Sequence, residues 1–200
     1  MSDQTVISLD PPAVIGQFLT QERLNGYFDA LMAENAKVNL VSRETSRASF
    51  DRMVAESLLP LTLVSGPSVG YLDIGAGGGL PAIPILLSNR VSGPAFLCER
   101  TKKKALALKK IAVQLGLEVD VLPRDFLGLK PRIQFDLITL RYVKLDSLLL
   151  DEIMVSLSSS GVFIYYSESP VTSPKYHSDA RKFSCGDDGI IKGFTLFRRS

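Results

Sequence analysis

The feature that most constrains this chain is a glycine-rich loop, Asp73–Leu80, which reads DIGAGGGL. A short apolar run, Val69–Ile74, leads into the loop and predicts a buried strand. The apolar stretch Leu80–Leu87 follows it and predicts a helix. A glycine loop carries a mechanism when it joins a strand to a helix in this way. The sequence therefore predicts a ligand-binding turn of an α/β fold.

Each position of the loop favours a particular chemistry. Gly75 permits a tight turn, Gly77 lets the backbone approach a ligand, and Gly79 allows close packing of helix on strand. Asp73 would repel a dinucleotide pyrophosphate at the helix N-terminus, but it favours the amino group and sulfonium of S-adenosylmethionine. Glu99 ends the next predicted strand and is placed to hold two ribose hydroxyls. A dinucleotide site and a turn without ligand stay open as alternatives.

Beyond the loop, predicted strands and helices alternate. The expected strands are Val69–Ile74, Ala95–Cys98, Glu118–Leu122, Phe135–Leu140, Gly161–Tyr166 and Gly193–Phe197. The expected helices among them are Leu80–Leu87, Thr101–Leu115 and Leu145–Leu157. This alternation is typical of an α/β, Rossmann-like fold with a mostly parallel sheet flanked by helices. The stretch Ser167–Gly189 is rich in Ser, Pro and Asp, and no element is assigned to it.

The N-terminal segment has a helical pattern instead. From Pro12 to about Ser65, apolar residues recur at steps of three and four, and a helix is expected over Ser46–Leu63. Gly66-Pro67 ends the pattern. We therefore expect residues 1–66 to form an N-terminal helical extension and residues 67–200 to form the α/β domain.

Composition excludes several classes of protein. With 46% apolar and 22% charged residues, the chain is globular. The net charge of +2 excludes a strongly basic polyanion binder, although residues 97–132 hold nine basic and four acidic residues. Cys98, Cys185 and His177 are too few for a disulfide framework or a metal site. We expect a cytoplasmic protein, since the start lacks a signal-peptide pattern and no apolar run would span a bilayer.

The residues after the loop resemble a known family. Gly77–Pro84 has the pattern Gly-x-Gly-Leu-Pro-x-Ile-Pro, which is similar to the RsmG (GidB) family. The resemblance covers about Asn39 to Gly161. It also includes Asn39-Leu40, Glu56-Ser57-Leu58, Glu99, Lys103-Lys104, Arg124, Phe135-Asp136 and Arg141.

The resemblance implies a class I methyltransferase that uses S-adenosylmethionine to methylate N7 of a guanine in 16S ribosomal RNA. N7 carries its own lone pair, so the reaction needs no general base, and a chain with one histidine is suited to it. Arg141, which the family places at cofactor and substrate, is the candidate catalytic residue, and no metal is expected. The residues expected to bind the cofactor are Asp73, Gly75, Gly77, Gly79, Leu80, Glu99, Asp125, Phe126 and Arg141.

Basic residues suggest where RNA would bind. Lys102, Lys103 and Lys104 on a predicted helix, with Arg124 after the next strand, are expected to contact phosphates of small-subunit ribosomal RNA. A solvated helix face is the alternative. Tyr142 is a candidate for stacking on a flipped base, although packing beneath a helix would also explain it.

Some positions depart from the family pattern. Met53 stands where the family has His, and Arg124-Asp125-Phe126 stands where it has Arg-Ala-Glu. Arg141-Tyr142 replaces Arg-Ala, and Ser167-Glu168 replaces Lys-Gly. A non-catalytic RNA- or ribosome-binding paralogue and a methyltransferase of small molecules therefore stay open as alternatives. The sequence does not identify the target nucleotide, and a monomer is the default expectation.

Overall fold

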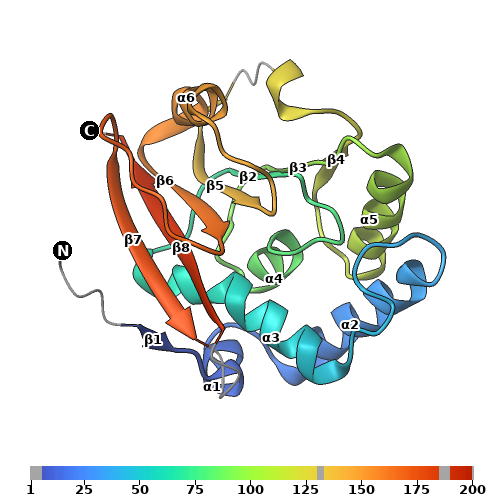
Figure 1. Cartoon of the computed structure of the whole chain (residues 1–200). Helices are drawn as coiled ribbons and strands as arrows, with labels where there is room; N and C mark the ends of the chain where they lie inside the picture. Colours follow the sequence, from blue (N-terminus) through green and yellow to red (C-terminus); the bar gives the residue numbers. More distant parts are fainter. Residues whose placement is uncertain (1–5, 130–132, 185–189, 200) are drawn as a thin grey trace.

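A computed structural model describes residues 6–129, 133–184 and 190–199, and its centre is one mixed β-sheet (Figure 1). The strand order across the sheet is β1-β7-β8-β6-β5-β2-β3-β4. The strands are β1 Ile7–Ser8, β2 Tyr71–Ile74, β3 Ala95–Cys98, β4 Asp120–Leu122, β5 Phe135–Arg141, β6 Leu157–Ser167, β7 His177–Ser184 and β8 Ile191–Arg198. The helices are α1 Pro11–Gly16, α2 Gln21–Asn35, α3 Arg47–Leu58, α4 Ala82–Leu87, α5 Lys102–Gln114 and α6 Ser147–Ser156, with 3₁₀ turns η1 Leu59–Leu63 and η2 Phe126–Gly128.

The parallel part of the sheet confirms the predicted fold class. Strands β4, β3, β2, β5 and β6 pair in parallel, with β2 at the centre. From β2 the chain crosses to β3 on one side and later to β5 on the other. Asp73 therefore lies opposite both Leu97 and Thr139. Ligands of open α/β sheets collect at the carboxyl ends of strands at such a reversal.

The other edge of the sheet is antiparallel. Strand β8 pairs antiparallel with both β6 and β7, and the two-residue β1 pairs with β7. Strand β7 lies within the stretch 167–189, to which sequence reasoning assigned no element, and β1 was not expected either. The alternation of apolar and polar residues along β1 and β7 is weak, because few of their residues are buried. Cys185 lies outside the described residues.

Helices cover the two faces of the sheet unequally. The buried residues of α1 to α5 share one hydrophobic cluster with one face, whereas α6 packs on the other face (Figure 1). Alternate side chains of β2 divide accordingly, with Tyr71 in the first cluster and Leu72 and Ile74 in the second. The segment before residue 67 therefore supplies much of the cover of one face.

The helix boundaries differ from expectation where proline or capping intervenes. The helix expected over Ser46–Leu63 ends at Leu58, and 3₁₀ turn η1 continues to Leu63. Pro60 has no N–H to donate to the carbonyl four residues earlier, so the α-helical pattern cannot continue through it. At the other end, the side chain of Ser46 caps α3 by accepting from the backbone N–H of Ser49.

Candidate functional site

Backbone hydrogen bonds fix the glycine loop at the end of β2. The N–H groups of Gly75 and Ala76 both donate to the carbonyl of Cys98, each over 2.9 Å. The N–H of Gly77 donates to Oε2 of Glu99 over 3.0 Å. The loop is thereby tied to the end of β3, the strand that sequence reasoning placed beside it.

The three glycines have different structural roles. Gly75, Gly77 and Gly79 have φ of 75°, 52° and 91°, in the left-handed region that favours glycine. A Cβ at Gly79 would lie 2.5 Å from Cγ1 of Ile83, so this glycine permits the close packing of α4, as expected. A Cβ at Gly77 would have the carbonyl oxygen of Gly75 as its nearest neighbour, at an ordinary contact distance of 3.8 Å, and Gly77 borders a cavity.

A cavity of about 1030 Å³ opens beside the loop at the carboxyl ends of the parallel strands. Its volume is at the upper end of the range of roughly 300–1,000 Å³ that is usual for ligand pockets. Its walls come from the loop 40–45, α3, the glycine loop, the ends of β3 and β5, and β8. Of the residues expected to bind the cofactor, it is lined by Gly75, Gly77, Leu80, Glu99, Asp125, Phe126 and Arg141.

Asp73 lies behind this wall and carries an unsatisfied oxygen. Its side chain is buried, and Oδ1 accepts a hydrogen bond from the hydroxyl of Thr139. Oδ2 has no hydrogen-bond partner among the described residues. Burial raises the pKa of this carboxyl to about 7, against the opposing effects of the Thr139 hydrogen bond and the charge of Arg141. A buried acceptor without a partner is costly, so a ligand cation or N–H donor would satisfy it.

One side of the cavity is built around Glu99. Its two carboxylate oxygens accept from the N–H groups of Gly77 and Thr101, over 3.0 and 2.7 Å, which fixes the side chain. Each oxygen keeps a lone pair for a further donor. Phe126 is buried in the core and also lines the cavity, and Asp125 caps η2 by accepting from the N–H of Leu127. The carboxylate oxygens of Glu99 can accept hydrogen bonds from ribose hydroxyls, and the flat apolar ring of Phe126 suits a purine.

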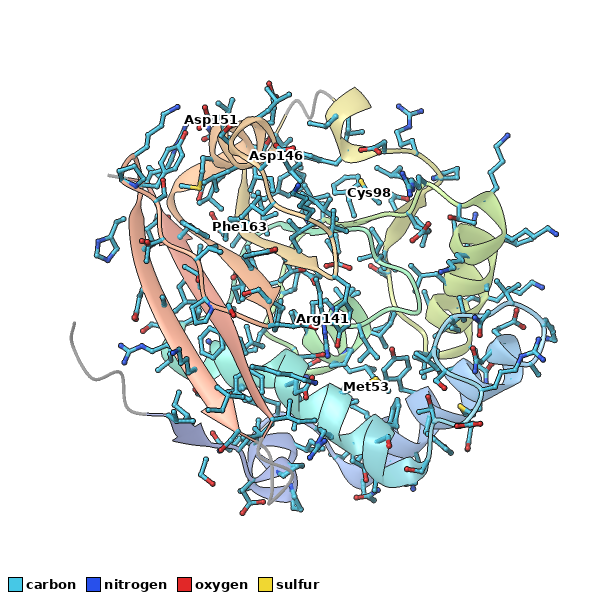
Figure 2. All side chains as sticks on the ribbon, viewed as in Figure 1. Met53, Cys98, Arg141, Asp146, Asp151 and Phe163 are labelled. Carbon is cyan, nitrogen blue, oxygen red and sulfur yellow. The ribbon has the colours of Figure 1, made fainter. Side chains whose placement is uncertain are left out.

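Arg141 ends β5 and is held by α3 (Figure 2). Its guanidinium is buried, and Nη2 lies 2.7 Å from Oε2 of Glu56 in an ion pair. Nη1 donates to the hydroxyl of Ser57 over 2.9 Å and to the carbonyl of Met53 over 3.3 Å. Arg141 therefore reaches the cavity as expected, but its donors are largely used to join the sheet to the N-terminal helices.

Sequence reasoning missed the part of the wall that comes from the N-terminal loop. Asn35 is buried, and its Oδ1 accepts from the N–H groups of Leu40 and Val41, which folds residues 40–45 over the cavity. Lys192 on β8 was missed as well. Its ammonium lies 2.7 Å from Oε1 of Glu56. An asparagine near a predicted helix end is a signal for the former, whereas nothing in the sequence around Lys192 indicates the latter.

The predicted RNA-contacting residues divide into two groups. Lys104 and Arg124 line the rim of the cavity, whereas Lys102 and Lys103 are exposed on α5 outside it. Further cationic side chains on the cavity wall are Arg52, Arg100, Lys144 and Lys192. Two of the acidic side chains there, Glu56 and Glu99, are buried. The mouth of the cavity is therefore basic.

Cys98 is buried in the core, and burial raises the pKa of its thiol to about 12, so it stays protonated at neutral pH. No group of histidine, cysteine and carboxylate side chains in the described part of the chain could hold a metal ion. Within the described ranges, no helix is both long and apolar enough to cross a membrane.

Several solved structures with the same fold are methyltransferases. One is an O-methyltransferase from Bacillus cereus in complex with SAH, which matches with a TM-score of 0.63 at 15% identity, over 88% of this chain and 91% of that one. Another is the N-methyltransferase NodS from Bradyrhizobium japonicum, with a TM-score of 0.61 at 15% identity, over 87% of this chain and 98% of that one. At this identity the likeness establishes the class I methyltransferase fold alone.

Relatives by sequence share a single name, Ribosomal RNA small subunit methyltransferase G. The protein of Magnetococcus marinus is 34% identical over 116 residues, which are 58% of this chain and 49% of the relative. That of Dictyoglomus thermophilum is 30% identical over 164 residues, covering 79% of this chain and 65% of the relative. The matched region thus spans about half to two thirds of the relatives' length.

A family model agrees with these relatives and spans most of the chain. The model described as rRNA small subunit methyltransferase G matches residues 20–183, which include α2, α3, the glycine loop and the parallel strands. This confirms the resemblance drawn from the pattern at Gly77–Pro84. The chain belongs to the GidB family.

Proposed function

We propose that this chain transfers a methyl group from S-adenosylmethionine to N7 of a guanine in 16S ribosomal RNA. The observation that carries the proposal is the cavity at the ends of β2, β3 and β5, which is lined by the glycine loop and the fixed carboxylate of Glu99. The unsatisfied carboxyl of Asp73 is buried two residues before the loop begins at Gly75. Membership of the GidB family supports the choice of substrate.

The donor set fits S-adenosylmethionine and assigns each residue a contact. Glu99 accepts from the two ribose hydroxyls, and Phe126 packs on the adenine while Asp125 hydrogen-bonds its edge. Gly75, Gly77 and Leu80 border the chain that links the ribose to the amino acid. Asp73 lies behind the wall on the side of the amino group, which would donate to its unpaired Oδ2. Gly79 contributes by letting α4 pack closely.

The proposed chemistry asks little of the protein beyond alignment. When bound, S-adenosylmethionine supplies an electrophilic methyl group on sulfur. Guanine N7 presents a lone pair and no proton, so this chain needs no general base at the site. Proximity and orientation alone can remove roughly 7–11 kcal/mol of the barrier. Arg141 serves as a positioning residue, since its ion pair with Glu56 fixes the end of β5 against α3.

The basic mouth of the cavity supports RNA as the substrate. Lys104 and Arg124 would contact phosphates, and Lys102 and Lys103 would extend the contact along α5. Each contact adds affinity that depends on salt and not on sequence. We infer a cytoplasmic, monomeric enzyme in which residues 1–66 act as a helical extension and residues 67–200 as the methyltransferase domain.

Two measurements test the proposal. S-adenosylmethionine and S-adenosylhomocysteine at one hundred times their dissociation constants should each stabilise the chain by about 2.7 kcal/mol. That is a rise in Tm of roughly 5–10 °C for a chain of this size, and NAD should produce none. Tritium from labelled S-adenosylmethionine should then enter unmodified small subunits, not large ones. Binding of small subunits without incorporation would favour the non-catalytic paralogue.

A further inference from the structure

A small annex adjoins the main cavity beyond the end of β5. It has a volume of about 90 Å³, and four residues line both spaces, namely Glu56, Arg141, Tyr142 and Lys192. The ends of β6 and β8 close its far side, with Tyr166 and Glu168 among the lining residues. The annex is too small for a nucleotide, so it suits the edge of a planar ring whose body remains in the main cavity.

Tyr142 stands at the boundary between the two spaces. Its side chain is 75% exposed, so it is not packed beneath a helix. Its φ of 57° is uncommon for a residue with a side chain, and such conformations cluster at functional sites. The guanidinium of Arg141 lies 4.9 Å from the ring centroid and donates to the phenol oxygen over 3.2 Å. A ring held in this way offers an open face for stacking.

The annex has one carboxylate with acceptor capacity to spare. Glu56 is buried, and its two oxygens are already paired with Arg141 and Lys192. Glu168 is exposed and makes no hydrogen bond or ion pair with the described residues. A free carboxylate beside an aromatic face is the arrangement that recognises a flat ring with two adjacent N–H donors on one edge.

We propose that this annex is the pocket for the acceptor base and that Tyr142 and Glu168 determine its specificity for guanine. Tyr142 stacks on the base, and the two oxygens of Glu168 accept from its N1–H and its exocyclic amino group. N7 lies on the opposite side of the purine from this edge, so it points back into the main cavity. Adenine would present an unprotonated N1 to the same carboxylate. The inference rests on the proposed function and deepens it.

The test compares two mononucleotides that differ in one group. Inosine monophosphate is guanosine monophosphate without the exocyclic amino group, and NMR titration of the chain saturated with S-adenosylhomocysteine measures the affinity for each. We expect guanosine monophosphate to bind about 10- to 150-fold more tightly, as a hydrogen bond to a charged group would give. Glu168→Gln should abolish most of that preference. Tyr142→Ala should weaken both nucleotides together, and Tyr142→Phe should restore them.

Controls separate this inference from the proposed function. Glu152→Gln changes an exposed carboxylate on α6 that lines neither space, so it should leave the preference intact. All variants should keep the Tm rise with S-adenosylhomocysteine, which shows that the fold and cofactor site are retained. The proposal that the annex binds guanine would be overturned by equal affinity of the wild type for the two nucleotides. It would also be overturned by a preference for guanosine monophosphate that Glu168→Gln leaves unchanged. If small subunits accept no methyl group while the preference for guanosine monophosphate is intact, the proposed RNA substrate is refuted. The proposal that the annex binds guanine is then still supported.

Discussion

The unpaired carboxyl of Asp73 makes a quantitative prediction about cofactor binding. Its pKa in the ligand-free chain is raised to about 7 by burial, so the group is mostly protonated at pH 6 and mostly ionised at pH 8. If the ionised form is the one that binds the amino group, the apparent Kd is divided by the ionised fraction. That fraction rises from about 0.1 to about 0.9 between pH 6 and pH 8, so affinity for S-adenosylhomocysteine should rise about tenfold.

The variant Asp73→Asn removes the titrating group. Its affinity at pH 8 should fall by about 1.5–3 kcal/mol, which is the usual contribution of a hydrogen bond to a charged group. The pH dependence between 6 and 8 should vanish with it. Isothermal titration calorimetry at three pH values, in buffers with different enthalpies of ionisation, measures both the Kd and the protons released on binding. Asp120→Asn, at an exposed position of β4, is the matched control.

The same group predicts how the stability of the free chain depends on pH. The folded state keeps the proton of Asp73 up to about pH 7, whereas an unfolded aspartate releases it near pH 3.9. Between these values the folded state binds more protons, so this group's contribution to stability falls by up to about 1.4 kcal/mol for each pH unit gained. It is fully present below pH 4 and lost above pH 7. Two results of the calorimetry would refute this reasoning. One is a wild-type Kd for S-adenosylhomocysteine that does not change from pH 6 to pH 8, and the other is an equal change of this Kd with pH in Asp73→Asn.

Three further substitutions test other parts of the account. Gly79→Ala should destabilise the chain by about 2–4 kcal/mol in denaturant unfolding, because its Cβ would lie 2.5 Å from a side chain of α4 at an unfavourable φ. Arg141→Ala should cost about 3–5 kcal/mol in the same assay, because it breaks a buried ion pair of Glu56. A loss below 1 kcal/mol in either case would contradict its assignment. Lys104→Ala should weaken binding of small subunits and lower the slope of log K against log salt by about one unit, whereas Lys109→Ala, outside the cavity rim, should leave it unchanged.

The parallel half of the fold and the glycine loop could be predicted because local sequence specifies them. The run Ala95–Cys98 is a strand with the predicted bounds, since a short apolar segment between turns has few alternatives. The sequence assigns Gly79 to close packing, and a Cβ at this position would lie only 2.5 Å from Cγ1 of Ile83, which agrees with that role. The resemblance at Gly77–Pro84 led to the family that the match over residues 20–183 confirms.

The remaining features depend on contacts between distant residues. Strand β7 pairs with β8 at an edge where few side chains are buried, so it leaves little periodic signal. Arg141 was expected at the cofactor, but its partner Glu56 lies 85 residues away in sequence, and no local pattern reveals such a pair. Lys192 joins the same network from the opposite end of the chain. Charge pairing of this kind follows from the fold and is visible only in three dimensions.

The most direct test of the central claim is the identity of the methylated nucleoside. Small subunits that lack the modification are incubated with the chain and S-adenosylmethionine, and their RNA is digested and analysed by mass spectrometry. The account predicts 7-methylguanosine with the wild type, and little or none with Glu99→Ala, which removes the carboxylate that fixes the loop and that we propose to hold the ribose. A methyl group on another nucleoside or another atom, or transfer that persists in Glu99→Ala, would contradict it.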